Sequence, residues 1–455
     1  MRRVAAAALA VVATGCGTTA SVPTKVVRSK AHATYIARVL VTVVDGNTHE
    51  RVRGAVVRVG GRIARTNAHG VARIPLRHHI ALITDVSAGG YSARSLRLSF
   101  RQRPQSTVEL YQPALQWPMY GVDESRTQAQ SNIHLRPPFR IVWTHATGAL
   151  TEFPAVISEG VAYVGNYNGT VTALSMADGH ELWRHVTRGG KMASSPAVWG
   201  DDLVVHGMDG VVRVLALSTG RLLAHYDVGS PIESSPIVRD GIDYFGSWNG
   251  RVYALDLRRM RLAWTFTSGC KLTSSAAISG GTVFIGDYCG RLLALRRVNG
   301  RERWAGVVNG RIYGTPAVAH GRVFVPSSDG GSLSAFTTGG RFLWRRDTGA
   351  YVYSSPAVWG GRVFFGAYNG VFYALSAANG RTLWTVGLGG AISGAAVVVD
   401  GVAYAGSFSH RIVGVDARSG RVLLDFPHGE YVPVSGDGGR LLLDGYSRLY
   451  AVEPR

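Results

Sequence analysis

The chain has 455 residues, 46% of them hydrophobic and 17% charged, and it carries a formal net charge of +20. This length excludes a single ordinary domain, and the hydrophobic content is ample for a large buried core. The positive charge comes almost wholly from arginine. For an exported protein it favours an anionic membrane surface over nucleic acid as a partner, although a compositional bias toward arginine is the simpler explanation.

The N-terminus has the pattern of an export signal. Two arginines follow Met1, and the apolar run from Val4 to Ala13 is too short to span a bilayer. Small residues then lead to Cys16, which resembles the lipobox of bacterial lipoproteins. That resemblance implies a signal peptide over residues 1–16 with lipid attachment at Cys16, and 17–33 as a polar tether; ordinary signal cleavage nearby is the alternative. We therefore expect an extracytoplasmic protein anchored to a bacterial membrane.

Residues 34–112 predict a small antiparallel β-sandwich of six or seven strands, because short alternating runs are divided by turn residues. Several features of this segment resemble the carboxypeptidase regulatory-like, transthyretin-like domain family. They are Asp45 and Thr48 in the first hairpin, the runs Gly54 to Val57 and Thr66 to Gly70, and the pair Gly90 and Tyr91. The resemblance implies a spacer or adhesion module rather than an enzyme. Residues 113–138, which contain four prolines, predict a linker.

Beyond the linker, one unit of 40 residues repeats through residues 139–455. In its clearest copy, four short strands alternate with glycine-rich turns, at Ser354 to Val358, Arg362 to Phe365, Val371 to Leu375 and Arg381 to Val386. A period of this length with four strands is typical of a β-propeller with one blade per repeat. Two copies lack the tryptophan of the fourth strand and carry Ala224 or Leu424 there. The tryptophans of the other copies are Trp143, Trp183, Trp264, Trp304, Trp344 and Trp384.

The number of first strands predicts eight blades. The eighth unit, from Val432 to Glu453, stops before its fourth strand, and Arg140 to Thr144 matches the missing strand. We expect this N-terminal strand to complete the last blade and leave no open edge in the ring. The first strands begin near Phe153, Ser194, Ser234, Ser274, Gly314, Ser354, Gly394 and Val432.

The repeat resembles propellers built from pyrroloquinoline-quinone-type repeats. The shared elements are SSPAV, G-x-x-N-G, Y-A-L and G-x-x-x-W, and the segment from Trp117 to Thr127 resembles the stretch that precedes the first blade in that family. The unit is also similar to the propeller lipoproteins of the outer-membrane β-barrel assembly machinery, which implies a binding protein that engages a protein partner through its loops. The sandwich domain is a departure from that family.

Two cysteines remain after Cys16, and both lie in the fourth unit. Cys270 precedes the first strand of that unit and Cys289 lies in the turn between its second and third strands. In an up-and-down blade these loops emerge on one face, so we expect a disulfide, worth about 3 kcal/mol for a loop of roughly 20 residues. Two free buried thiols are the alternative.

Two sets of equivalent repeat positions are candidates for a binding face. The turn before the third strand carries five aromatic residues, which would stack on sugar rings or peptide side chains or else wedge between blades. The position at which first strands enter the channel carries three cations, which would capture an anionic group or else form a solvated rim. The aromatic set is Tyr167, Trp248, Tyr288, Tyr368 and Phe408; the second set is Lys191, Pro231, Lys271, Arg311, Tyr351, Ala391 and Tyr431.

Three classes of function compete. The sequence has no HExxH, CxxC pair, G-x-S-x-G or P-loop motif, so we expect no catalytic residue and no metal site. We favour a lipid-anchored, non-catalytic and monomeric scaffold that binds a protein partner. The alternative is a dehydrogenase that uses pyrroloquinoline quinone and calcium; the basic positions at the channel mouth argue against it, because calcium needs clustered carboxylates. The third class is a cell-surface adhesion or glycan-binding protein.

Overall fold

The computed structural model describes residues 37–76, 81–100, 104–187 and 189–455. The predicted signal peptide, Cys16 and the tether lie outside these residues. Within the described ranges, no helix is long and apolar enough to cross a bilayer. One 3-10 turn, η1 (Pro113–Leu115), is present, and nearly all other regular structure is β-strand.

The first seven strands form a sandwich of two sheets, ordered β4-β1-β7 and β3-β2-β5-β6. Alternate residues of β1 and β2, such as Val41 and Val57, are fully buried between the sheets. The expected antiparallel arrangement is wrong for one pair, because β7 runs parallel to β1. A parallel pair needs a long connection, and the strands between β1 and β7 supply it. The strands are β1 (Ala37–Asp45), β2 (Val56–Val59), β3 (Arg62–Arg65), β4 (Val71–Leu76), β5 (Ala81–Ser87), β6 (Arg94–Ser99) and β7 (Gln105–Leu110).

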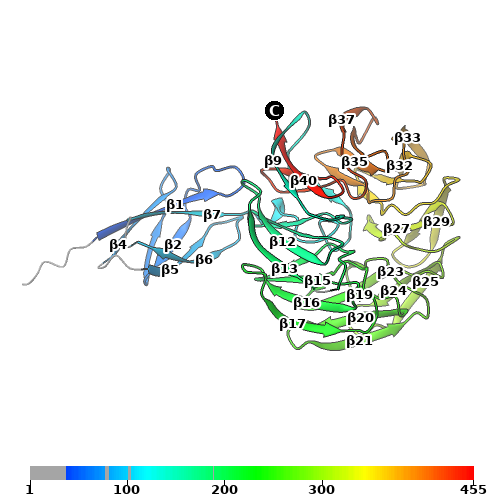
Figure 1. The fold of residues 1–455 in the computed structure, drawn as a ribbon, viewed down its shortest axis with the longest axis horizontal. Coiled ribbons are helices and arrows are strands. Elements are labelled where there is room, and N and C mark those ends of the chain that lie inside the picture. The colour runs from blue at the N-terminus through cyan, green and yellow to red at the C-terminus, as the bar shows by residue number, and fades with distance from the viewer. Residues whose placement is uncertain (1–36, 77–80, 101–103, 188) are drawn as a thin grey trace, which may run out of the picture.

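The remaining strands of the described chain form eight further sheets arranged around a common centre as a β-propeller (Figure 1). We number these propeller sheets one to eight in chain order. Sheet one contains β10 (Val156–Ser158), β11 (Val161–Gly165), β12 (Thr170–Ser175) and β13 (Glu181–Val186). Sheet two contains β14 (Ala197–Trp199), β15 (Asp202–His206), β16 (Val211–Ala216) and β17 (Leu222–Asp227). Sheet three contains β18 (Val238–Arg239), β19 (Ile242–Gly246), β20 (Arg251–Asp256) and β21 (Arg261–Thr267).

The next three sheets repeat this antiparallel order. Sheet four contains β22 (Ala277–Ser279), β23 (Thr282–Gly286), β24 (Arg291–Arg296) and β25 (Glu302–Val307). Sheet five contains β26 (Ala317–Ala319), β27 (Arg322–Ser327), β28 (Ser332–Thr337) and β29 (Phe342–Asp347). Sheet six contains β30 (Ala357–Trp359), β31 (Arg362–Gly366), β32 (Val371–Ser376) and β33 (Thr382–Gly387).

The last two sheets each include a strand from elsewhere in the chain. Sheet seven contains β34 (Val397–Val399), β35 (Val402–Ser407), β36 (Arg411–Asp416) and β37 (Val422–Phe426), with β8 (Ala129–Gln130) parallel to β34. Sheet eight contains β38 (Val434–Gly436), β39 (Leu441–Asp444) and β40 (Arg448–Pro454), with β9 (Phe139–Ala146) as its outer strand. The predicted pairing of the N-terminal strand is present: β9 runs antiparallel to β40, with Trp143 opposite Ala451 (Figure 1).

The repeated tryptophans join neighbouring propeller sheets. Each indole Nε1 donates to a carbonyl in the next sheet, as Trp143 does to Met176 at 2.9 Å, and each ring covers a turn glycine there. A Cβ at Gly179 would lie 2.5 Å from Trp143 Cε3, and Gly179 has a φ of 75° that favours glycine. Leu424 lacks this role because sheet eight has no turn between its third and outer strands, which come from opposite ends of the propeller sequence.

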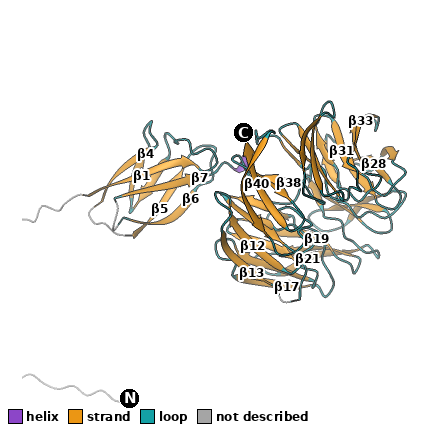
Figure 2. Ribbon diagram, turned by 45° about the horizontal axis from the view of Figure 1, so that its top comes forward, coloured by secondary structure: helices purple, strands orange, loops and turns teal. Residues whose placement is uncertain are grey.

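The segment predicted as a linker also closes one end of the propeller. Backbone carbonyls between Pro118 and Gln128 accept hydrogen bonds from the first strands of five different sheets, and Trp117 and Tyr120 are buried. Arg126 is 1% exposed, and its guanidinium donates to the carbonyls of Ala276 and Pro236 at 2.9 Å each. The strand donors are the N–H groups of Val198, Ile278, Val318, Val358 and Val398. Figure 2 shows the sandwich beside the propeller, joined through this part of the chain.

A ring of hydroxyl groups surrounds the channel above this segment. The backbone N–H of Ser235 donates to Ser275 Oγ at 2.8 Å, and the same contact recurs from sheet two to sheet six. The first strands of these sheets therefore begin later than predicted, because the residues before them form hydrogen bonds to the neighbouring sheet around the channel instead of within their own sheet. The other links are Ser195 to Ser235, Ser275 to Thr315, and Thr315 to Ser355, at 3.1, 3.3 and 2.9 Å.

Candidate binding site at the mouth of the central channel

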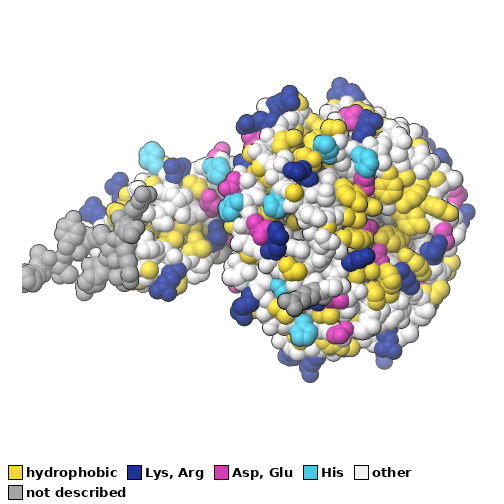
Figure 3. All heavy atoms as spheres, in the orientation of Figure 1, with side chains coloured by type: hydrophobic (Ala, Val, Ile, Leu, Met, Phe, Trp, Pro, Cys, Tyr) yellow, Lys and Arg dark blue, Asp and Glu magenta, His cyan; other side chains and the backbone are white. Residues whose placement is uncertain are grey.

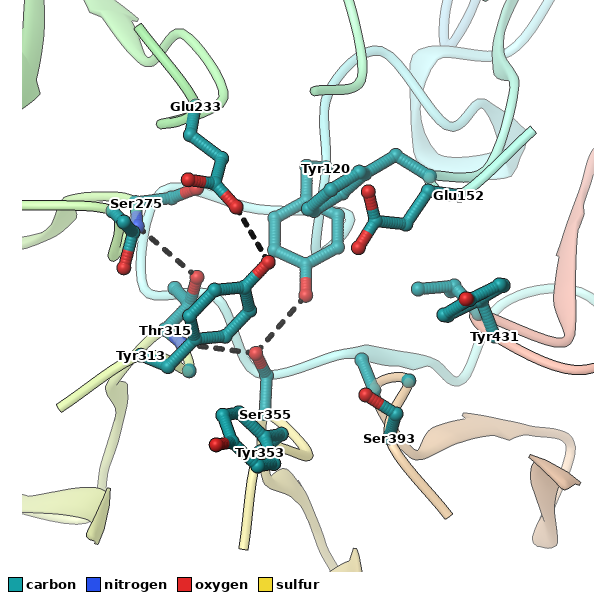
Figure 4. A pocket seen from close by; sticks show the side chains of 16 residues that line it. Tyr120, Glu152, Glu233, Ser275, Tyr313, Thr315, Tyr353, Ser355, Ser393 and Tyr431 are labelled. Atoms are coloured by element: carbon teal, nitrogen blue, oxygen red, sulfur yellow. Dashed lines mark hydrogen bonds between the residues drawn. The ribbon is translucent and has the colours of Figure 1, made fainter. Parts of the chain in front are cut away.

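A small cavity of about 30 Å³ lies at the mouth of the channel, above the buried Tyr120. Six of its lining residues occupy one repeat position, which successive sheets present toward the centre. Tyr120 forms part of its lining and donates from its hydroxyl to Ser355 Oγ at 3.1 Å (Figure 4). The residues at the repeated position that line the cavity are Glu152, Glu233, Thr273, Tyr313, Tyr353 and Ser393.

Glu233 is the more deeply placed of the two glutamates, with 8% of its surface exposed. Its Oε1 accepts from the Tyr313 hydroxyl at 2.5 Å, and its Oε2 accepts from Trp248 Nε1 at 3.0 Å. Both oxygens of this carboxylate are therefore held by aromatic donors. The predicted residue Trp248 belongs to the site through this bond.

Glu152 lies across the cavity, on the other side of Tyr120 in the view of Figure 4. It accepts a hydrogen bond from the Tyr167 hydroxyl. The pKa of Glu152 is raised to about 7, chiefly by burial and also by the nearby charge of Glu233, while hydrogen bonds from Tyr167 and Tyr313 oppose the change. The same surroundings raise the pKa of Tyr313 well above its usual value, first through burial and then through both glutamates.

The three predicted cations form a rim around this acidic cavity. Lys271 Nζ lies 3.3 Å from the ring centre of Trp248 and 5.0 Å from that of Tyr288, and burial lowers the pKa of Lys271. Lys191 Nζ lies 6.0 Å from the ring centre of Tyr167. Arg311 lies 5.6 Å from that of Tyr288, and its Nε pairs with Asp329 at 2.9 Å. The aromatic and basic sets, derived separately from the sequence, thus interleave on one face.

The remaining predicted aromatics continue the face over sheets six to eight. Tyr368 meets Tyr351 and Phe408 with ring centres about 6 Å apart, and Phe408 meets Tyr431 at 5.5 Å. Tyr351 is 51% exposed, Phe408 38% and Trp248 37%. These rings contact one another along the face instead of being wholly wedged between sheets. Figure 3 shows hydrophobic side chains, tyrosine included, gathered across the middle of the propeller with charged side chains among them.

A disulfide fixes part of the rim. Cys270 and Cys289 are bonded, with their Cα atoms 5.9 Å apart. Cys270 precedes Lys271 and Cys289 follows Tyr288, whose N–H donates to the Lys271 carbonyl at 2.9 Å. The disulfide therefore restrains the backbone at Lys271 and at Tyr288, two residues of the face.

With this geometry in place, comparison with known proteins identifies the family. Residues 139–259 and 248–454 match the family described as "Outer membrane protein assembly factor BamB", and these two stretches cover more than half of the chain. The chain belongs to the BamB family. The BamB of Bordetella pertussis is 31% identical over 81 residues, which are 18% of this chain. That match spans only 21% of the length of the Bordetella protein.

Solved structures extend the comparison to the fold. The crystal structure of BamB from Moraxella catarrhalis matches 70% of this chain and 98% of that chain, with a TM-score of 0.60 and 16% identity. A quinohemoprotein alcohol dehydrogenase from Comamonas testosteroni matches 74% of this chain and 80% of that chain, with a TM-score of 0.66 and 13% identity. At these identities the likeness shows the propeller fold alone.

Pyrroloquinoline quinone, the cofactor of the dehydrogenase alternative, does not fit the cavity of this BamB-family chain. A volume of about 30 Å³ holds one or two water-sized groups, far below the 300 Å³ or more of a typical cofactor site. The quinone carries three carboxylates, which Glu152 and Glu233 would repel. Among the described residues, no group of three or more His, Cys, Asp or Glu side chains is placed to hold a metal ion.

The predicted cations lie at the mouth, but they form its rim, and the cavity inside that rim is acidic. The repeat position that lines the cavity is two residues after the predicted basic position of Lys191 and Lys271. The sequence pattern therefore did not predict the two glutamates. Tyr431, grouped with that set from the sequence, lines the cavity instead, because the eighth repeat is shorter. An alignment of the repeats on the residue immediately before each serine pair, such as Glu233 before Ser234 and Ser235, would have drawn attention to this position.

Proposed function

We propose that this BamB-family protein is a non-catalytic scaffold that binds a protein partner through the face around the channel mouth. As part of this proposal, each of the eight propeller sheets is one blade of an eight-bladed ring. The observation that carries it is the face itself, on which half-exposed tryptophan, tyrosine and phenylalanine alternate with lysine and arginine. Aromatic residues and arginine are the side chains most enriched in protein interfaces and their hot spots.

The proposal extends to where the protein acts. The family name refers to assembly of outer membrane proteins, and we place this chain outside the cytoplasm, attached through Cys16 with residues 17–33 as the tether. The Cys270 disulfide supports an oxidising compartment. The sandwich, residues 34–112, serves as a spacer of the carboxypeptidase regulatory-like type between the anchor and the propeller.

Photo-crosslinking at the membrane tests this function. A photoreactive residue in place of Tyr351, which is 51% exposed, should capture one partner in cells. Trp248→Ala and Lys271→Glu should reduce that capture strongly, since each removes a central contact of the face. Phe342→Ala and Arg341→Glu are matched controls, because both residues are exposed on or beside the outer strand β29. Equal capture by all four variants would refute the proposal.

Glycan binding is a second candidate, favoured by one observation. A depression of about 510 Å³ beside the mouth is lined by Tyr351 and Tyr368 together with Asp329, Asp347 and Asn369. An aromatic platform with carboxylate and amide groups at its edge suits a sugar ring. Oligosaccharide binding that Tyr351→Ala abolishes, with crosslinking to proteins absent, would favour this function over the first.

A further inference from the structure

The lining of the cavity is acidic and therefore complementary to a positively charged ligand. We propose that the cavity at the channel mouth binds one primary ammonium group, held by the carboxylates of Glu152 and Glu233 and by the aromatic rings around them. The group is the end of a lysine side chain of a partner or a small free amine. The lysine source rests on the proposed function; the site itself does not.

The chemistry of the lining carries this proposal. The sixteen described residues that line the cavity include two glutamates and no lysine, arginine or histidine. The groups that act on the pKa of Glu152 are Tyr167, Glu233 and Tyr313, and none of them is a cation. Lys271 on the rim interacts with Glu233, but no cation acts on Glu152 and none lines the cavity. A cation bound between the two carboxylates removes the repulsion between them.

A separate observation points to a missing ligand. Thr273, at the same repeat position as the glutamates, is 5% exposed and lines the cavity. Its hydroxyl acts on the Tyr288 side chain, but no described group donates a hydrogen bond to its Oγ1. Buried hydroxyls are nearly always paired, so this atom is available to accept from a bound donor. An ammonium group has three N–H donors, which match one hydroxyl and two carboxylates.

The size of the cavity and its aromatic walls select the type of cation. About 30 Å³ accepts an ammonium group, which is as compact as a water molecule, but excludes a trimethylated one. Tyr313, Tyr353 and Tyr431 supply rings for cation–π contact. Lys271 is not the occupant, because its Nζ lies over Trp248 and Tyr288 on the rim.

Saturation-transfer difference NMR on the purified chain tests the site directly, with Nα-acetyl-lysine N-methylamide and methylammonium as probes. We expect signals from the ε-methylene of the lysine probe and from methylammonium, and none from the Nε-trimethyl derivative. Signals from methylammonium alone support the site and assign it to a small amine. Equal signals from the trimethyl derivative, or none from either primary amine, overturn the proposal.

Variants show whether the signal comes from this cavity. Glu152→Gln or Glu233→Gln should weaken binding about tenfold or more, the value of one charge-assisted hydrogen bond. Glu181→Gln is the matched control, since this carboxylate pairs with Arg184 on β13 at 2.5 Å, away from the mouth. Binding to the two cavity variants that equals binding to the unaltered chain refutes the site.

The pH dependence of the unaltered chain is a measurement that needs no variant. Glu152, which faces Tyr167, Glu233, Tyr313 and Tyr431, must be ionised to hold the cation. Binding should therefore be stronger at pH 8 than at pH 6, and a flat profile contradicts the proposal. Failure to capture a protein by crosslinking, together with a positive NMR result, would refute the proposed function but leave the site standing.

Discussion

Met260 stands at the turn position of sheet three where other propeller sheets have the glycine that receives a tryptophan, and the residue facing it from sheet two is Ala224. Both pack against the same hydrophobic cluster. Met260 has a φ of 47°, in the left-handed region that glycine favours. At this pair of positions the large side chain stands on the turn, and the small one stands on the fourth strand where other sheets have tryptophan.

This exchange predicts a compensating pair of substitutions. Ala224→Trp alone should destabilise the protein by about 1–3 kcal/mol, because the indole meets the Met260 side chain. Met260→Gly together with Ala224→Trp should restore most of the loss, since it recreates the arrangement of Trp183 and Gly220. Denaturant unfolding of the single and double variants measures the coupling, and strictly additive effects would show that the two positions do not interact.

The hydroxyl ring makes a second prediction. Ser275→Ala removes the acceptor of the buried Ser235 N–H and should lower the free energy of unfolding by about 1–3 kcal/mol. Ser279→Ala, at the end of β22, is the matched control and should change it by less than about 0.5 kcal/mol. Equal effects of the two substitutions would mean that the ring contact adds no stability.

The raised pKa of Glu152 predicts how stability depends on pH. A carboxyl whose folded pKa of about 7 exceeds its unfolded pKa binds protons more tightly when folded, so its contribution is lost as pH rises through 7. Glu152→Gln, which stays neutral, should therefore gain melting temperature relative to the unaltered chain between pH 5 and pH 8. A constant difference between the two proteins across that range would contradict the assignment.

The disulfide predicts a local rather than a global effect. Cys270→Ala with Cys289→Ala removes a bond that closes a loop of 19-residue separation and should cost about 3 kcal/mol. The propeller should remain folded, since the hydrogen bonds within sheet four are unaffected. Far-ultraviolet circular dichroism with thermal unfolding checks both points, and loss of the β-sheet signal at room temperature would show that the bond holds the whole fold.

The poor fit of the quinone predicts the result of calorimetry. Titration of the purified chain with pyrroloquinoline quinone, with and without calcium, should give no heat of binding. The cavity is too small for the ring system and carries two glutamates where the quinone brings carboxylates. Micromolar binding that depends on calcium would restore the dehydrogenase alternative.

The sequence alone determined the propeller and the way its ends meet. These follow from local signals, because glycine turns, short alternating strands and a fixed spacing of tryptophans specify each sheet within one 40-residue unit. The strand at Arg140 to Thr144 was recognisable for the same reason, as a missing part of a known unit. The aromatic and basic positions of the mouth were also found, since the repeat places equivalent residues on one face.

Only the tertiary structure showed that those aromatic and basic residues surround an acidic cavity. Glu152 and Glu233 are 81 residues apart, and nothing local shows that their side chains reach one cavity. The segment that begins at Trp117 was predicted as a linker, yet it closes one end of the channel. Its backbone carbonyls accept hydrogen bonds from N–H groups of the first strands, which lie at the centre of the propeller. A site at a symmetry axis is assembled from one side chain of each sheet, so its charge emerges only when the ring is closed.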